Sequence, residues 1–98
     1  MTRDEIIATL RAHRAEIEAR KITSLALFGS FARGDAGPDS DVDLLFEYDM
    51  ARVPGLFELM ETQEYLAELL GARVDLVPRD GLKPLLRPAV LRDALPAF

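Results

Sequence analysis

The spacing of apolar residues near the start of the chain predicts an amphipathic helix over Thr2–Arg20. Thr2 and Glu5 stand at the spacing of a capping box, in which each side chain bonds the backbone N–H of the other residue. The apolar residues that follow fall on one side of such a helix: Ile6, Ile7, Leu10 and Ile17. His13 lies near this stripe, where a lone histidine is typical of packing and not of catalysis.

Three short segments rich in β-branched and apolar residues predict strands at Ile22–Phe28, Val42–Tyr48 and Arg73–Val77. The Gly-Pro pair and the aspartates of Asp35–Asp39 predict a loop between the first two strands. The alternating side chains of each strand point to opposite faces of the sheet, so every second residue shares a face.

Two further helices are predicted in the second half of the chain. One starts near Pro54, carries an apolar stripe and ends at Gly71. The other covers Leu82–Leu95 and is interrupted or shifted by Pro84 and Pro88. The resulting order, αββαβα, predicts an α/β (α+β) fold with a small mixed sheet of about three strands flanked by helices.

Length and composition narrow the functional classes. A chain of 98 residues fits a single domain, residues 1–98. Its net charge of −5 argues against direct nucleic-acid binding, which needs a basic face, but not against one phosphorylated ligand held through metal ions. The absence of cysteine excludes disulfides and cysteine catalysis. No signal peptide or membrane span is recognisable, so we expect a cytoplasmic protein without membrane contact.

The most unusual chemistry lies at the head of the second predicted strand. Six acidic residues and no basic one stand between Arg33 and Arg52. Asp41 and Asp43 alternate and so share a face, and Asp75 has the same apolar-Asp-apolar setting in the third strand. If these strands are neighbours, three carboxylates form one patch, where their mutual repulsion is relieved by divalent cations. The patch is thus a candidate site for two Mg²⁺ ions.

An ordinary interpretation of the same residues is that Asp41 and Asp43 form the solvent face of a half-exposed strand, with Asp39 as a turn residue. The turn after the first strand favours the functional interpretation. Gly29 permits a close backbone approach to a ligand, and Ser30 adds a hydroxyl at the start of a short predicted helix. Arg33 follows as a cation suited to phosphate oxygens. Metal-binding and phosphate-binding groups therefore stand at adjacent strand ends, as Mg²⁺ with a nucleoside triphosphate requires.

Several competing motifs do not fit the sequence. The string GSFARG lacks the middle glycine of the dinucleotide fingerprint, and no Gly-Lys-Ser/Thr follows to make a P-loop. A calcium loop starting at Asp39 fails because Leu44 occupies its glycine position and Met50 its last ligand position. One histidine without cysteine leaves no ordinary zinc site.

Gly29-Ser30, ten residues, and then Asp41-Val-Asp43 reproduce the G-S-x10-D-x-D signature of the polymerase-β-like nucleotidyltransferases. The strings LFGSFARGDAGPDSDVDLLFE and ARVDLVPRDGLKPLLRPAVLRDAL resemble the minimal nucleotidyltransferases, or MNT domains, of prokaryotes. The resemblance implies that Asp41 and Asp43 ligate both Mg²⁺ ions and that Asp75 completes the metal site and helps to deprotonate the acceptor hydroxyl. It also implies that Gly29 and Ser30 hold the triphosphate of ATP, with Arg33 at the usual basic position.

The MntA-type members of this family are antitoxins paired with HEPN-domain ribonuclease toxins. The resemblance therefore implies an enzyme that transfers AMP from ATP to a tyrosine of a partner HEPN toxin. The small size of the chain agrees, because it leaves no second domain to enclose a free acceptor. Two alternatives stay open: an antitoxin that acts by binding alone, and a subunit of a small-molecule nucleotidyltransferase. Apolar residues of the last predicted helix are candidates for partner contact, although we expect most of them to cover the sheet instead: Leu82, Leu85, Leu86, Val90 and Leu91.

Overall fold

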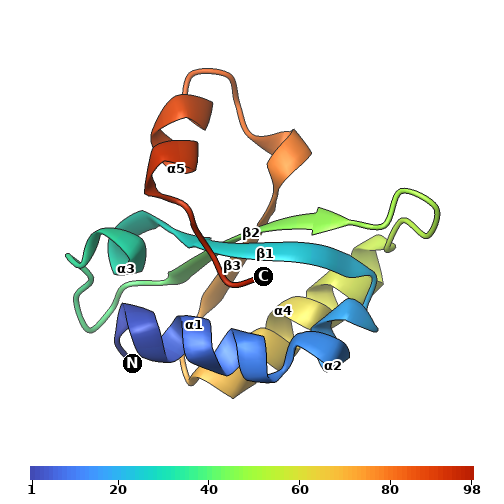
Figure 1. Cartoon of the computed structure of the whole chain (residues 1–98), viewed down its shortest axis with the longest axis horizontal. Helices are drawn as coiled ribbons and strands as arrows, with labels where there is room; N and C mark the ends of the chain where they lie inside the picture. The colour runs from blue at the N-terminus through green and yellow to red at the C-terminus, as the bar shows by residue number, and fades with distance from the viewer.

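The computed structural model describes all 98 residues and consists of a mixed β-sheet with helices on both faces (Figure 1). The predicted fold class is confirmed, although the sheet has four strands where about three were expected. In chain order the elements are α1 (Arg3–Ala12), α2 (Arg14–Glu18), β1 (Ile22–Phe28), α3 (Gly29–Arg33), β2 (Val42–Tyr48), α4 (Leu56–Leu70), β3 (Val74–Pro78), the 3-10 turn η1 (Arg79–Gly81), α5 (Arg87–Asp93) and β4 (Leu95–Pro96).

The strands lie in the order β3-β2-β1-β4. β1 pairs antiparallel with β2 on one side and with β4 on the other, whereas β2 and β3 run parallel through the α4 crossover. β3 is an edge strand. Part of its open side is covered by α4, whose Gln63 Oε1 accepts a hydrogen bond from Leu76 N at 3.2 Å. Parallel pairing thereby brings the start of β3 beside the start of β2.

The core lies between one face of the sheet and helices α1, α2 and α4 (Figure 1). Every second residue of the central strand β2 faces this core, namely Val42, Leu44 and Phe46. The residues between them, including Asp43, therefore face the other side of the sheet, over which α5 lies. No helix of the chain is sufficiently long and apolar to cross a membrane.

The predicted first helix is divided at His13. Its start is as expected, because Thr2 and Glu5 form both hydrogen bonds of the capping box. At His13 the backbone leaves helical geometry, with φ −107° and ψ 19°, and ring Nδ1 lies 2.9 Å from the carbonyl oxygen of Thr9. The side chain thus competes for a carbonyl of the helix, and α2 starts one residue later.

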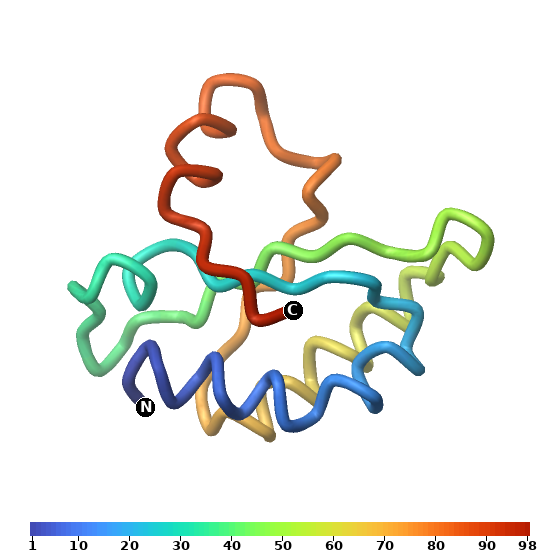
Figure 2. Tube along the Cα trace, viewed as in Figure 1, coloured from blue at the N-terminus to red at the C-terminus, as the bar shows by residue number.

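The predicted helix over Leu82–Leu95 is wrong in its extent. Only α5 is helical, and Pro88 lies in its first turn, where the missing N–H of proline is tolerated. Residues 82–86, which include Pro84, precede this helix without belonging to it. Residues 79–93, which we call the arch, rise from the end of β3 and return to the sheet (Figure 2).

The strand β4 was not predicted. Its two residues pair with β1, and the backbone N–H of Ala97 donates to Leu25 O at 2.8 Å. Arg11 reaches across from α1, with Nε donating to Ala97 O at 2.7 Å. β4 thus covers the outer edge of β1, and Ala97, which follows it, is buried in the core.

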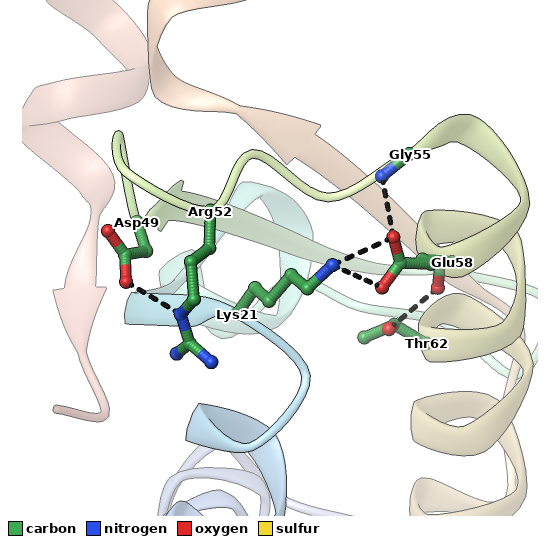
Figure 3. Close-up of polar contacts among 6 residues, drawn as sticks. All are labelled: Lys21, Asp49, Arg52, Gly55, Glu58 and Thr62. Atoms are coloured by element: carbon green, nitrogen blue, oxygen red, sulfur yellow. Dashed lines mark hydrogen bonds and ion pairs between the residues drawn. The ribbon is translucent and has the colours of Figure 1, made fainter.

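The loop between β2 and α4 is held by polar contacts at both ends (Figure 3). Arg52 pairs with Asp49 at 3.0 Å on one side. On the other, Glu58 accepts a hydrogen bond from Gly55 N at 3.1 Å and pairs with Lys21 Nζ at 2.9 Å. These interactions lower the pKa of Glu58, with the hydrogen bond from Lys21 as the larger cause. Glu58 therefore connects the start of α4 to the turn before β1.

Replacing Glu58 with glutamine is expected to lower the melting temperature at pH 7. A carboxyl whose pKa is lowered by folding stabilises the folded state above its unfolded pKa, and this contribution disappears as the pH falls through the folded pKa. The gap between wild type and Glu58→Gln should therefore be present at pH 7 and close in acid, as followed by thermal unfolding. Glu61→Gln is the control, since Glu61 lies on the same helix and forms no ion pair. A gap independent of pH would contradict this role of Glu58.

Candidate active site

The register of the two parallel strands brings Asp43 and Asp75 together. Asp43 of β2 stands directly opposite Asp75 of β3. On the other side, Asp43 stands opposite Phe28, the last residue of β1 before Gly29. The strands of the two aspartates are thus neighbours, as the three-carboxylate hypothesis requires, and both side chains lie on the face away from the main core.

Asp43 is the central carboxylate. Its side chain is half-buried, whereas Asp75 at the sheet edge is exposed. Burial raises the pKa of Asp43, and the negative charges of Asp75 and Asp41 raise it further, while Arg33 lowers it. Both main causes disfavour the ionised carboxylate. A bound cation would remove this penalty, which makes the position suited to a ligand of positive charge.

Gly29 is fitted against the Asp43 carboxylate. Its φ of +75° is left-handed, and a Cβ added here would lie 2.2 Å from Asp43 Oδ2 and 3.1 Å from Cγ. Only glycine permits both the backbone conformation and this close approach. The Gly-Ser turn predicted from the sequence is therefore packed directly onto the acidic strand.

Asp41 has a different setting from Asp43. It precedes β2, and its Oδ1 pairs with Arg73 Nε at 3.0 Å. Arg73 also donates from Nη2 to the carbonyl oxygen of Asp39 at 3.3 Å. The structure thus places Asp41 near Asp43, but with one carboxylate oxygen occupied by a cationic side chain.

Ser30 and Arg33 lie on α3, the short helix that was expected after Gly29. Ser30 is half-buried, and its carbonyl oxygen accepts the backbone N–H groups of Gly34 and Asp35. Arg33 donates from Nε to Asp35 at 3.2 Å and from Nη1 to Asp93 at 3.4 Å, which raises the pKa of its guanidinium. Arg33 therefore connects α3 to α5 in this conformation.

The residues of this site fit Mg²⁺ by their chemistry. Carboxylate oxygens are its preferred protein ligands, and burial together with the negative charges of Asp75 and Asp41 disfavours an ionised Asp43 that has no cation beside it. No three acidic or histidine side chains are arranged to hold a metal ion in this conformation. The three aspartates thus stand at neighbouring backbone positions, but their carboxylates do not converge on one point.

Two residues of the site were not predicted from the sequence: Arg73, which pairs with Asp41, and Asp93, which pairs with Arg33 as Asp35 also does. The signal for Arg73 was present in the spacing. Once Asp75 is aligned with Asp43, Arg73 falls opposite Asp41 by the same offset. No comparable signal exists for Asp93, because its position depends on how the arch folds.

Comparison with known proteins identifies relatives along almost the whole chain. The sequence model of the nucleotidyltransferase domain matches residues 10–96. The protein adenylyltransferase MntA of Thermococcus cleftensis is 41% identical over 96 residues, which are 97% of this chain and 95% of the relative.

Solved structures share the fold. A structure proposed to be a minimal nucleotidyltransferase superposes with a TM-score of 0.80 and 38% identity, covering 98% of this chain and 96% of the other. A more distant match, with a TM-score of 0.65 and 19% identity, is described as the tri-AMPylated HEPN toxin of Shewanella oneidensis in complex with its MNT antitoxin. It covers 94% of this chain and 71% of the other, and shows likeness of fold.

Proposed function

Since this chain belongs to the nucleotidyltransferase domain family, we propose that it transfers AMP from ATP to a tyrosine hydroxyl of a partner HEPN ribonuclease toxin and so acts as an antitoxin. The likeness to an MntA adenylyltransferase supports adenylyl transfer. The AMPylated toxin described for the Shewanella complex supports a HEPN protein as acceptor.

One observation carries the proposal: Asp43 lies between Gly29 on one side and Asp75 on the other. The turn predicted to bind phosphate and two of the carboxylates predicted to bind metal therefore stand at neighbouring positions on adjacent strands. We assign Asp41, Asp43 and Asp75 as ligands of two Mg²⁺ ions, which when bound would neutralise the charge of the triphosphate. Gly29 and Ser30 would hold that triphosphate, and Arg33 would contribute a cation beside it.

In the proposed reaction the tyrosine oxygen attacks the α-phosphorus of ATP. A new oxygen–phosphorus bond forms, the bond to the β,γ-phosphates breaks, and pyrophosphate leaves with that electron pair. The hydroxyl proton passes to Asp75, whose exposed position at the sheet edge lets an acceptor approach from solvent. Asp43, half-buried beside Gly29, orients the nucleotide and not the acceptor.

Exposed apolar side chains on the arch support a protein acceptor. On the arch, Leu85 is 95% exposed and Leu86 is 56% exposed, while Leu82, Val90 and Leu91 are half-buried. We assign partner contact to the first two of these residues. A second set of exposed apolar side chains lies on the loop after β2 and on α4: Met50, Val53, Leu56, Phe57 and Met60.

The test is to incubate the purified protein with Mg²⁺, ATP labelled at the α-phosphate, and the HEPN protein of the same genome. We expect label on the HEPN protein and an intact mass raised by one or more AMP units. A chelator should stop the transfer and added Mg²⁺ should restore it. The Asp41→Asn, Asp43→Asn double variant should leave the HEPN protein unmodified while still unfolding cooperatively.

The contrary outcomes separate the alternatives. A HEPN protein that is inhibited but keeps its unmodified mass would point to an antitoxin acting by binding alone. Label on a free hydroxylated molecule and none on the HEPN protein would point to a small-molecule transferase. Transfer at the wild-type rate by the double variant would remove the assigned carboxylates from the reaction.

A further inference from the structure

Arg73 is placed at the site by the strand register and not by proximity in sequence. The residue offset that pairs Asp43 with Asp75 also sets Arg73 against Asp41, just before the two strands begin. Val42 N, at the start of β2, donates to Arg73 O at 2.8 Å. Arg73 therefore stands beside Asp41, at the entrance to the Asp43–Asp75 pair. It supplies a basic residue to a segment that has six acids and none of its own between Arg33 and Arg52.

The contacts of Arg73 are directed at the acidic segment. Nε pairs with Asp41 Oδ1 at 3.0 Å, and Nη2 donates to Asp39 O at 3.3 Å. The arginine side chain is 79% exposed, and that of Asp41 is 46% exposed. An ion pair so open to water contributes little to folding stability, so the fold alone gives no strong reason for it. Its clearest consequence is that a carboxylate assigned to the metal already has a cationic partner.

We propose that Arg73 is a positioning residue that acts as the counter-ion of Asp41 in the metal-free protein and competes with the divalent cation for this carboxylate. The inference rests on the proposed metal site. A guanidinium bound to Oδ1 holds the carboxylate toward the arginine, and its positive charge repels an approaching cation. Metal binding therefore requires this exposed pair to loosen, and Arg73 sets how tightly the empty site takes up metal before nucleotide arrives.

The test measures metal binding in the absence of nucleotide. Mn²⁺ is titrated into the full-length protein, and free Mn²⁺ is followed by electron paramagnetic resonance. Arg73→Gln should bind Mn²⁺ about two- to fivefold more tightly than wild type, the range expected for removal of an exposed ion pair. Arg73→Lys keeps the charge and should stay close to wild type.

Two controls separate this role from a general change of charge. Arg52→Gln removes the same charge and a comparable pair, Arg52 Nε to Asp49 at 3.0 Å, at the other end of β2, and should change Mn²⁺ affinity less than Arg73→Gln. In the Asp41→Asn background, Arg73→Gln should alter the affinity clearly less than it does in the wild-type background. Thermal unfolding confirms that each variant is folded.

Equal or weaker Mn²⁺ binding by Arg73→Gln would overturn the inference, as would an equal gain in Arg52→Gln or a lack of measurable binding by both wild type and variant. The failure of this inference is distinguishable from failure of the proposed function. If AMP is transferred to the HEPN protein but Arg73→Gln leaves the Mn²⁺ affinity unchanged, only the counter-ion role of Arg73 is rejected. If Arg73→Gln binds Mn²⁺ more tightly but the wild-type protein transfers no AMP, the proposed reaction is rejected and the counter-ion role of Arg73 stands.

Discussion

Replacing Asp43 with asparagine is expected to abolish AMP transfer and, in the same protein, to raise the melting temperature of the unliganded form at pH 7. Activity should fall at least about a hundredfold. Removing a residue that only supports a metal ligand already costs up to about that much, and Asp43 is proposed to be a ligand itself. Asparagine has the shape of aspartate, so the packing against Gly29 is retained. The variant removes only the negative charge and with it one proposed metal ligand.

The gain in stability follows from the direction of the pKa shift. Folding raises the pKa of Asp43 through burial and through repulsion by Asp75 and Asp41. Between the unfolded and folded pKa values the folded state holds more protons, so stability falls as the pH rises through this window and stays lower above it. The advantage of Asp43→Asn should therefore be largest at neutral pH and vanish in acid below the unfolded pKa.

Thermal unfolding at several pH values, without and with Mg²⁺ and ATP, measures both effects. Ligand should stabilise wild type and not the variant, which reverses their order. Asp49→Asn is the control of opposite sign, because hydrogen bonds from Ala51 N and Arg52 lower the pKa of Asp49, and its removal should destabilise the protein at pH 7. An Asp43→Asn variant less stable than wild type at pH 7 would show that the carboxylate is not strained in the unliganded protein.

Gly29→Ala is expected to impair both folding and catalysis. The added Cβ would enter the space of the Asp43 carboxylate, 2.2 Å from Oδ2, at a backbone φ of +75°. Left-handed backbone costs a residue other than glycine about 1–3 kcal/mol. Displacement of the carboxylate adds to this cost, and a misplacement of about 1 Å at a reacting centre can reduce the rate about a hundredfold.

Gly34→Ala is a matched control for Gly29→Ala. Gly34 has a φ of +85°, and an added Cβ there meets nothing within 4 Å, so it carries the backbone strain without the collision. Chemical denaturation should show a larger loss of unfolding free energy for Gly29→Ala than for Gly34→Ala. In an Asp43→Ala background the two losses should become similar, since the colliding carboxylate is gone. Equal losses in the wild-type background would mean that Asp43 moves aside freely.

The elements that the sequence predicted well are those specified by local patterns. The strands Ile22–Phe28 and Val42–Tyr48 have the predicted bounds, and Gly71 ends α4 in the left-handed conformation, as expected of a helix-terminating glycine. The strand β4 could not be predicted in the same way. It has two residues, one of them Pro96, and exists only because the end of the chain returns to the edge of β1.

For the candidate site, the sequence could name the carboxylates but not their partners. The alternation of Asp41 and Asp43 is a local property, whereas the neighbourhood of Asp75 depends on which strands pair. In the structure β2 and β3 do pair, with Asp43 opposite Asp75. Alternation also predicted that Asp41 points with Asp43, but it could not predict the ion pair of Asp41 with Arg73, which depends on the register of β2 and β3. The roles of these residues in catalysis remain predictions, as do those of Gly29, Ser30 and Arg33.

The edge position of β3 connects the integrity of the site to one folding event. Asp75 belongs to a strand held by β2 on one side and by the Gln63 contact of α4 on the other. If α4 detaches from the sheet, this strand loses a neighbour and Asp75 loses its fixed place opposite Asp43. We therefore expect the segment from Val42 to Pro78 to open as a single cooperative unit in the native state. The carboxylates can act together only in molecules where that unit is closed.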